Sequence, residues 1–340
     1  MKATKTTLIV GILAMMFLAV GCKKEKTEEK VSSNSDGCVG MLRFNSAEEF
    51  RETQEKVLAM SEAERREWEQ QQGFKSYATK CEELFEELEA KGINSDEDIY
   101  NFVKENSDYF FIREEDGEKY LTSYLEFSSY YRFVDENRML QIGDNIIKAF
   151  DDGIISAPIE EQENLLNVTS FYEPARECFY YFEYSFGGLF PDSKDADDGC
   201  DCSREEIIAR KTNGNERTYV RCYIDNATIL TGDSGYDSFL YSQGLRNVCY
   251  IMKVRPYKKI LGVWYWCRRT ITYNVNYSVY DNYNYHLVSG NKQGQDGGGK
   301  IEIVLHSFEG YPNLEYYNSI TGYAATPNAT RPITCSTINP

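Results

Sequence analysis

The stretch VWYWCRRTITYNVNYSVY, residues 263–280, gathers side chains that can stack on a ligand and hydrogen-bond to it. In an extended strand, successive side chains point to opposite faces. One face then carries two indoles, a guanidinium and two amides, from Trp264, Trp266, Arg268, Asn274 and Asn276. Exposed aromatic rings flanked by such groups suit stacking on sugar rings or gripping a protein surface. We therefore predict that these five residues bind a glycan or protein ligand.

The opposite face of this stretch is largely apolar and is its predicted core side, with Arg269 as the one misfit. Two alternatives remain open. Another layer of the protein would bury the tryptophans, and a bulge near Arg268 and Arg269 would reverse which residues share a face. Because the run exceeds ordinary strand length, we also expect a break within it.

A serine in the segment TGDSGYDS, residues 231–238, raises the question of nucleophilic catalysis. Its Gly-Asp-Ser-Gly core resembles the nucleophile segment of trypsin-like proteases, but there the histidine precedes the serine, and here His286 and His306 follow Ser234. An order of Ser234, an aspartate and His306 would suit other serine hydrolases, because triads are defined by geometry. The strand-to-helix segment G-x-S-x-G of one such fold is missing. We therefore favour a β-turn at residues 232–235 and keep a hydrolase as the alternative.

Two other stretches match phosphate-binding and calcium-binding patterns only in part. GQDGGGKI, residues 294–301, has the spacing of a phosphate-binding loop, but Ile301 replaces the Ser or Thr that would bind magnesium. The residues after it predict a strand, whereas such a loop needs a helix there. The acids of DSKDADDGCD, residues 192–201, do not fall on the alternating positions of an EF-hand. We predict a glycine-rich hairpin loop and a solvated acidic loop, with an irregular calcium loop left open.

The cysteines do not suggest a metal site either. Nine cysteines follow Cys22, and they lack the CxxC pairs or accompanying histidines that a zinc site needs. An odd number leaves at least one of them unpaired, and the sequence does not give the disulfide connectivity. We predict no metal ligands and no cofactor.

The elements that would position these side chains are strands. Residues 171–340 are rich in Tyr, Val, Ile and Thr, in strand-length runs separated by Gly, Asn and Asp. The clearest of these runs are YVRCYI, NVCYIMKV and KIEIVLHSF. We predict a mainly antiparallel, sandwich-like β domain over residues 171–340.

Residues 42–170 predict helices followed by short β-hairpins. A serine followed three residues later by an acid predicts helix starts at Ser46, Ser61 and Ser95. Helices are expected to end at Gly73 and Gly92. Farther on, YFFIREEDGEKYLTSYL predicts a hairpin, and RFVDENRMLQIGDNIIKAFDDG predicts shorter strands around its glycines. The fold class is α+β, with this N-terminal domain preceding the β domain.

Three of these segments carry a resemblance to a known family. MLRFNSAEEF, MSEAERREWEQQQGFKS and QIGDNIIKAFDDG resemble uncharacterised lipoproteins of gut Bacteroidota. The resemblance covers roughly residues 38–170 and extends into KILGVW near Trp264. It implies an envelope lipoprotein of unknown function and supplies no catalytic residues.

The first 22 residues have the features of a secreted lipoprotein. Two lysines precede an apolar run, Leu8–Val20, which is too short to span a bilayer as a helix. Gly21 and Cys22 then resemble the lipobox of bacterial lipoproteins, although Ala19 stands where Leu is usual. The resemblance implies that Cys22 carries fatty acyl chains such as palmitate and anchors the mature chain.

We accordingly predict a signal peptide over residues 1–21 and a flexible tether over residues 22–41. The tether begins with charged and small polar residues that cannot offset the entropy of ordering. An ordinary secretory signal with an incidental cysteine is the alternative. The expected location is the cell envelope, with lipid anchoring to the outer membrane, facing the periplasm or the cell surface.

The charge of the chain excludes one class of partner. The formal net charge is −17, and residues 22–170 hold 35 acids and 18 bases. An acidic surface repels phosphate backbones, so nucleic acid is not an expected partner. The expected function is non-catalytic binding of a glycan or protein by a membrane-anchored envelope lipoprotein. An extracytoplasmic hydrolase and a structural subunit of a surface assembly are the alternatives.

Overall fold

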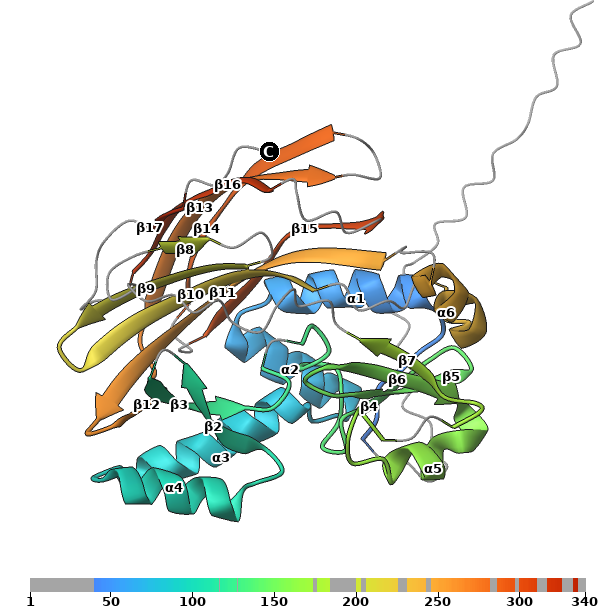
Figure 1. Ribbon diagram of the computed structural model, residues 1–340, viewed down its shortest axis with the longest axis horizontal. Coiled ribbons are helices and arrows are strands. Elements are labelled where there is room, and N and C mark those ends of the chain that lie inside the picture. Colours follow the sequence, from blue (N-terminus) through green and yellow to red (C-terminus); the bar gives the residue numbers. More distant parts are fainter. Residues whose placement is uncertain are drawn as a thin grey trace, which may run out of the picture. The chain divides into compact units, whose positions relative to one another are not determined.

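The computed structural model describes most of the chain after residue 39 (Figure 1). The described residues are 40–115, 117–126, 128–173, 176–183, 200–202, 206–225, 231–242, 246–281, 286–296, 300–310, 317–325 and 333–335. The signal peptide, Cys22, nearly all of the tether and the acidic stretch up to residue 199 lie outside these ranges. No helix within them is both long and apolar enough to cross a membrane.

Four helices follow the start of the described chain, and each begins at a serine cap. They are α1 (Ala47–Ala59), α2 (Glu62–Gln72), α3 (Tyr77–Lys91) and α4 (Asp96–Glu105). The predicted caps at Ser46, Ser61 and Ser95 are confirmed, and the latter two form complete capping boxes. The predicted end of α2 at Gly73 is also confirmed, at a φ of +64° that glycine adopts without strain.

The first sheet combines the start of the described chain with the strands after the helices. Its order is β1 (Arg43–Phe44), β4 (Met139–Ile142), β5 (Asn145–Ala149), β6 (Gly153–Pro158) and β7 (Tyr180–Glu183). β1 runs parallel to β4, and the other neighbours are antiparallel. Three short helices pack against this sheet: η1 (Ile159–Glu161), α5 (Gln162–Leu166) and α6 (Ser234–Ser242).

The second sheet contains strands from both halves of the chain. Its order is β2 (Phe110–Glu115), β3 (Glu118–Ser123), β12 (Val263–Trp266), β11 (Arg246–Ile260), β10 (Glu216–Asp225), β9 (Glu206–Asn213) and β8 (Cys200–Cys202). β15 (Ile301–Gly310) also pairs with β11. β2 and β3 form the predicted hairpin, and β12 runs parallel to β3.

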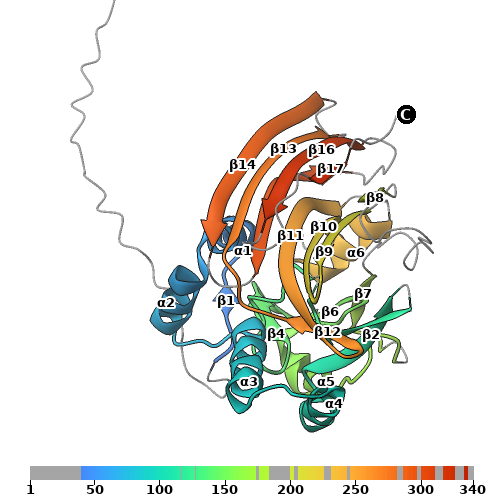
Figure 2. The same cartoon turned by 90° about the vertical axis from the view of Figure 1, so that its left-hand side faces the viewer.

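A third sheet is formed late in the chain. Its order is β14 (His286–Asp296), β13 (Ile271–Asp281), β16 (Tyr317–Ala325) and β17 (Ile333–Cys335). Figure 2 shows these four strands side by side. They approach the second sheet, with β13 and β14 near β15, and β16 near β10. The fold is therefore α+β, as predicted.

The predicted boundary between residues 170 and 171 does not separate two structural units. β7 from the second half completes the first sheet, and β2 and β3 from the first half belong to the second sheet. One hydrophobic core contains residues of both halves, such as Phe85 and Trp266. The described residues belong to one compact unit. The composition therefore changes where helices give way to strands, within a continuous core.

The long run of residues 263–280 is broken, as its length predicts. β12 ends at Trp266, and β13 begins at Ile271 in a different sheet. The alternation of faces along one strand therefore does not continue through residues 267–270.

Charged side chains fill part of the interior where the loop after β3 meets β11. Glu126 is 2 % exposed, and its carboxylate lies 3.3 Å from Nζ of Lys253 and 2.5 Å from the Arg255 guanidinium. Lys253 and Arg255 are two residues apart on β11 and so share one face. These three residues are the buried ion cluster.

Electrostatics keep the carboxylate of this cluster ionised. Burial alone raises the pKa of Glu126, but the charges of Arg255 and Lys253 outweigh burial and lower this pKa to about 2. Burial also lowers the pKa of Lys253, whereas the Arg255 guanidinium stays protonated. Arg255 is therefore the permanent cation that holds Glu126 in its charged form.

Replacing Glu126 with Gln should lower the free energy of unfolding at pH 7 by about 3–5 kcal/mol, because Arg255 then lies buried without its carboxylate. The folded-state pKa of Glu126 is depressed, so its contribution is complete above the ordinary pKa of 4.5 and disappears as pH falls through about 2. The variant should consequently show a shallower loss of stability between these pH values. Urea unfolding from pH 2 to 7 measures both effects.

Glu114→Gln is the matched control, because that carboxylate is 71 % exposed. Its effect on the free energy of unfolding should stay within about 0.5 kcal/mol. Equal losses in the two variants would show that the buried ion cluster does not stabilise the fold.

Candidate functional site

Both tryptophans of the predicted ligand face lie in the core. Trp264 and Trp266 are 2 % and 5 % exposed, because β12 lies between β3 and β11 within the second sheet and α3 packs over it. The ring of Phe85 on α3 lies 5.1 Å from that of Trp266. The predicted exposed aromatic face is therefore wrong. The alternative of a covering protein layer describes these residues.

Arginines of β11 and β10 stack on the two indoles. The guanidinium carbon of Arg255 lies 3.5 Å from the ring centre of Trp266, and that of Arg217 lies 4.2 Å from Trp264. Cation–π contacts that are shielded from water contribute about 2 kcal/mol or more. The groups that stack on the two tryptophans are therefore arginine side chains of this chain and not a ligand.

Arg268 lies in the break between β12 and β13, where the helices hold it. Its guanidinium lies 3.2 Å from Glu62 of α2 and also pairs with Glu86 of α3. Arg66 contacts the same two carboxylates, at 3.0 and 2.7 Å. These ion pairs fasten residues 267–270 to the helices and give Arg268 a structural role.

Asn274 and Asn276 lie on β13, away from the tryptophans. The amide nitrogen of Asn291 on β14 donates to both of their side-chain oxygens, at 2.7 and 2.9 Å. The three amides form a ladder across the hairpin. The structure thus divides the five predicted residues between the second sheet, the break and the third sheet, and whether the two asparagines bind a ligand stays a prediction.

Ser234 is the first residue of α6, so the predicted β-turn at residues 232–235 is wrong. Its side chain is buried, and its hydroxyl oxygen lies 2.5 Å from that of Ser156 on β6. His306 lies on β15, which contacts α1 and belongs to a different sheet. This placement does not favour the serine triad.

The remaining chemical motifs give little that could react or bind metal. β15 begins directly after Lys300, so the strand predicted after the glycine-rich stretch is confirmed; residues 297–299 lie outside the described ranges. Across the described residues, no group of three or more His, Cys, Asp or Glu could hold a metal ion. Cys81, Cys178 and Cys267 have free thiols.

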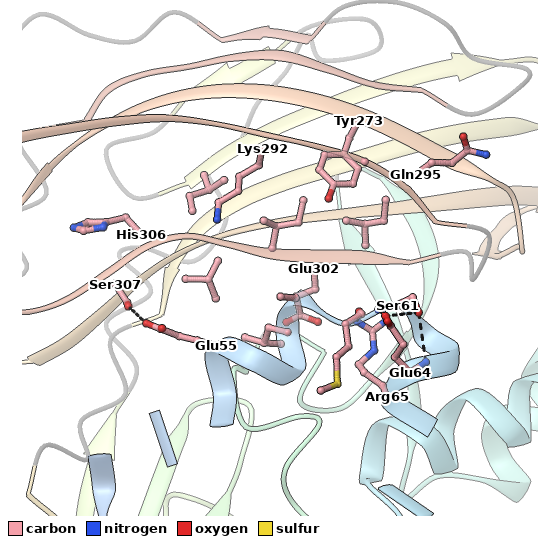
Figure 3. Close-up of a pocket in the computed structure, with 18 residues that line it drawn as sticks. Glu55, Ser61, Glu64, Arg65, Tyr273, Lys292, Gln295, Glu302, His306 and Ser307 are labelled. Atoms are coloured by element: carbon pink, nitrogen blue, oxygen red, sulfur yellow. Dashed lines mark hydrogen bonds between the residues drawn. The ribbon is translucent and has the colours of Figure 1, made fainter. Parts of the chain in front are cut away.

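A cleft of about 620 Å³ lies among α1, α2, β13, β14 and β15 (Figure 3). Its lining comes from the end of α1 and the start of α2, from one end of the β13–β14 hairpin, and from residues 301–307. His306 is the single lining residue that the sequence suggested for a chemical role. No local pattern in the sequence predicts the cleft, because the helical residues 55–65 and the strand residues 273–307 that form it are far apart in the chain.

The β13–β14 hairpin forms one side of the cleft. Tyr273 and Lys292 point into the cleft in Figure 3, whereas the amide of Gln295 points away from it. Tyr273 pairs directly with Gly294 and covers it, since a Cβ at that glycine would lie 2.7 Å from the tyrosine hydroxyl. Lys292 is exposed. This side therefore offers a solvated ammonium group beside a fixed aromatic ring.

The opposite side is the connection between α1 and α2. The backbone N–H of Ser61 donates to the Glu64 carboxylate at 2.8 Å, and this hydrogen bond helps to lower the pKa of Glu64. Arg65 is buried and donates to the carbonyl of Met60 at 2.6 Å. These bonds fix the polar groups at the base of the cleft, next to apolar residues of α1.

β15 forms the wall between these two sides. Its pairing with β11 shifts register between Tyr250 and Ile251, which leaves a bulge at Leu305. The hydroxyl of Ser307 donates to the carboxylate of Glu55 on α1 at 2.8 Å. The wall is thus attached to a sheet on one side and to a helix on another.

A fixed negative charge lies in this wall. Burial raises the pKa of Glu302, but Lys300 and Lys253 outweigh burial and lower it to about 2. The Lys300 ammonium lies 3.1 Å from that carboxylate and 4.3 Å from the ring centre of Tyr131. Burial lowers the pKa of Lys300 to about 8. Glu302 is therefore ionised at neutral pH.

Trp266→Ala should cost stability, because the indole is buried against Arg255 and Phe85. We expect the free energy of unfolding to fall by about 3–5 kcal/mol, as for other large aromatic side chains in cores. Tyr236→Ala is the control, since Tyr236 on α6 is 52 % exposed, and its effect should stay within about 0.5 kcal/mol. Urea unfolding measures both; wild-type stability of Trp266→Ala would contradict the burial of that indole.

Comparisons with known proteins add little to this geometry. No protein-family model matches the chain, and no curated protein matches it. The crystal structure of a DUF4848 family protein from Bacteroides thetaiotaomicron is similar over 85 % of this chain and 94 % of that chain, at 16 % identity and a TM-score of 0.30. A similarity at this TM-score establishes neither the fold nor a function for this chain.

Proposed function

We propose that this chain is a lipid-anchored protein of the bacterial cell envelope that binds a glycan or protein ligand without transforming it. The cleft among α1, α2 and β13–β15 is the binding site, in place of the buried tryptophan face. The observation that carries this proposal is the cleft itself: its volume of about 620 Å³ lies within the range of ligand pockets, and polar groups converge on it.

The lining of the cleft suits binding better than catalysis. Glu55, Glu64 and Arg65 are engaged in hydrogen bonds within the protein, so they define a fixed surface. Lys292 is exposed on the facing hairpin and is available to a ligand. The burial of Ser234 against Ser156 gives a serine hydrolase no support. A structural subunit of a surface assembly has no specific observation in its favour.

The lipid anchor rests on the sequence around Cys22. Several acyl chains bind a membrane stably, since each buried CH₂ contributes about 0.8 kcal/mol. The anchor would hold the protein at the outer membrane, facing the periplasm or the cell surface.

We further infer that the second and third sheets pack as a sandwich-like unit, which is supported by the approach of β16 to β10 and of β13 to β15.

Cys22→Ser should release the protein from the membrane, because the acylated thiol is lost. Wild-type protein should incorporate labelled palmitate and sediment with the outer membrane, and the variant should do neither. The same fractionation of Lys24→Ser, which alters the tether alone, should match wild type. Unlabelled wild-type protein in the cytosolic fraction would overturn the anchor and the envelope location together.

Lys292→Glu should weaken ligand binding by about tenfold or more, because it reverses the exposed charge at the cleft. Gln293→Glu is a matched control, since the exposed Gln293 lies one residue from Lys292 on the opposite face of β14 and the substitution adds a negative charge at constant size. Binding of both variants and wild type to glycan and extracellular-protein arrays provides the measurement. Equal binding by all three, or no ligand on either array, would overturn the proposed site.

A further inference from the structure

Two strand edges meet at the cleft. Within the described residues, β15 pairs with β11 alone, and β14 pairs with β13 alone. The two strands approach each other without belonging to the same sheet. Each therefore has a second edge to which the described part of the chain adds no strand.

The edge of β15 opens into the cleft. All seven residues 301–307 line it. A cavity that meets one face of a strand touches alternate residues, because successive side chains point to opposite faces. Contact with seven consecutive residues therefore indicates that the cleft runs along the edge of the strand. Figure 3 agrees, with β15 crossing between the hairpin residues and the α1–α2 residues.

A strand edge has a chemistry of its own. In an antiparallel pair, every second residue directs both its N–H and its C=O to the partner strand, and the residues between direct theirs outward. The outward pairs repeat at about 6.8 Å along an edge. An extended polypeptide presents donors and acceptors at the same spacing, and a sugar chain does not. Open edges of this kind bind peptides by accepting them as an added strand.

We propose that the ligand of the cleft is an extended segment of a partner protein, which pairs through its backbone with the outer edge of β15. This inference rests on the proposed function, because it specifies which of the two ligand classes the same cleft takes. Seven residues of strand span about 20 Å, so the cleft accepts a segment of about six residues.

The two sides of the cleft specify the side chains of that segment. Alternate residues of an added strand point toward the hairpin, where Lys292 favours an acidic residue and Tyr273 an apolar one. The residues between them point toward Leu58 of α1 and Met60, the residue that follows α1, and these favour apolar side chains. The expected peptide therefore has apolar residues at the positions that face the helices, and an acidic and an apolar residue at the positions that face the hairpin.

Selection from a random octapeptide phage library tests this proposal, with the full-length protein in detergent micelles as the target. Selected peptides should bind wild type and Gln293→Glu equally and should bind Lys292→Glu at least tenfold more weakly. Each amide of one selected peptide is then N-methylated in turn. Alternate positions should lose about tenfold in affinity, because their N–H groups pair with β15, and the positions between should keep it.

Hydrogen exchange gives a second measurement that does not depend on variants. Binding of the selected peptide should slow the exchange of alternate backbone amides within residues 301–304, before the bulge at Leu305, because those amides point to the added strand. The amides between them already pair with β11 and should change little.

The outcomes separate the inference from the proposed function. Glycans that bind in a Lys292-dependent way, with no selected peptide, would overturn the peptide and keep the cleft as the site. Peptides that tolerate methylation everywhere, or leave residues 301–304 unprotected, would overturn strand addition. Self-association that blocks the cleft would assign it to a second copy of this chain and likewise overturn a foreign partner.

Discussion

The charge of Glu126, buried between Lys253 and Arg255, is the constraint on which the arrangement of the two halves depends. Removing the charges of Glu126 and Arg255 from water costs several kcal/mol for each ion, and only close pairing offsets this cost. The carboxylate comes from the loop after β3, and the cations come from β11, more than a hundred residues later. Their pairing fixes β11 against the first half of the chain. β12 and β15 pair with β11 and are fixed with it.

The same constraint explains why the tryptophans are buried. Arg255 lies between Glu126 and the ring of Trp266, so the indole screens from water a cation that the fold must keep inside. Arg217 is placed in the same way by Glu118 and Trp264. In the sequence, tryptophans beside arginine and asparagine indicate stacking on a polar partner. They do not reveal whether that partner is a ligand or another strand of the same chain.

The sequence predicted the features that depend on residues close together in the chain, and it missed those that depend on distant segments. A serine cap needs only the residue three positions later, and the caps at Ser46, Ser61 and Ser95 were predicted from that spacing. The start of α6 had a similar signal, because Asp233 accepts a hydrogen bond from the N–H of Tyr236, but the serine motif favoured a turn. The placement of β12 beside β3, and the cleft itself, depend on pairings between distant segments that no local pattern records.

The cleft and the buried ions are connected through β15, and this connection bears on how the strand could bind. Glu302 lines the cleft, yet its charge is held by Lys300 inside the protein. Its neighbours on β15 pair with β11, which carries Lys253 and Arg255. The backbone along the cleft is therefore ordered before any ligand arrives, so an added strand would not have to offset the entropy of ordering it.

An open strand edge can also pair with other chains and aggregate, but α1 and the β13–β14 hairpin flank the edge of β15, and a bulge interrupts it. These flanking elements hinder pairing with the edge of a second sheet, as the proposed addition of a single extended chain requires.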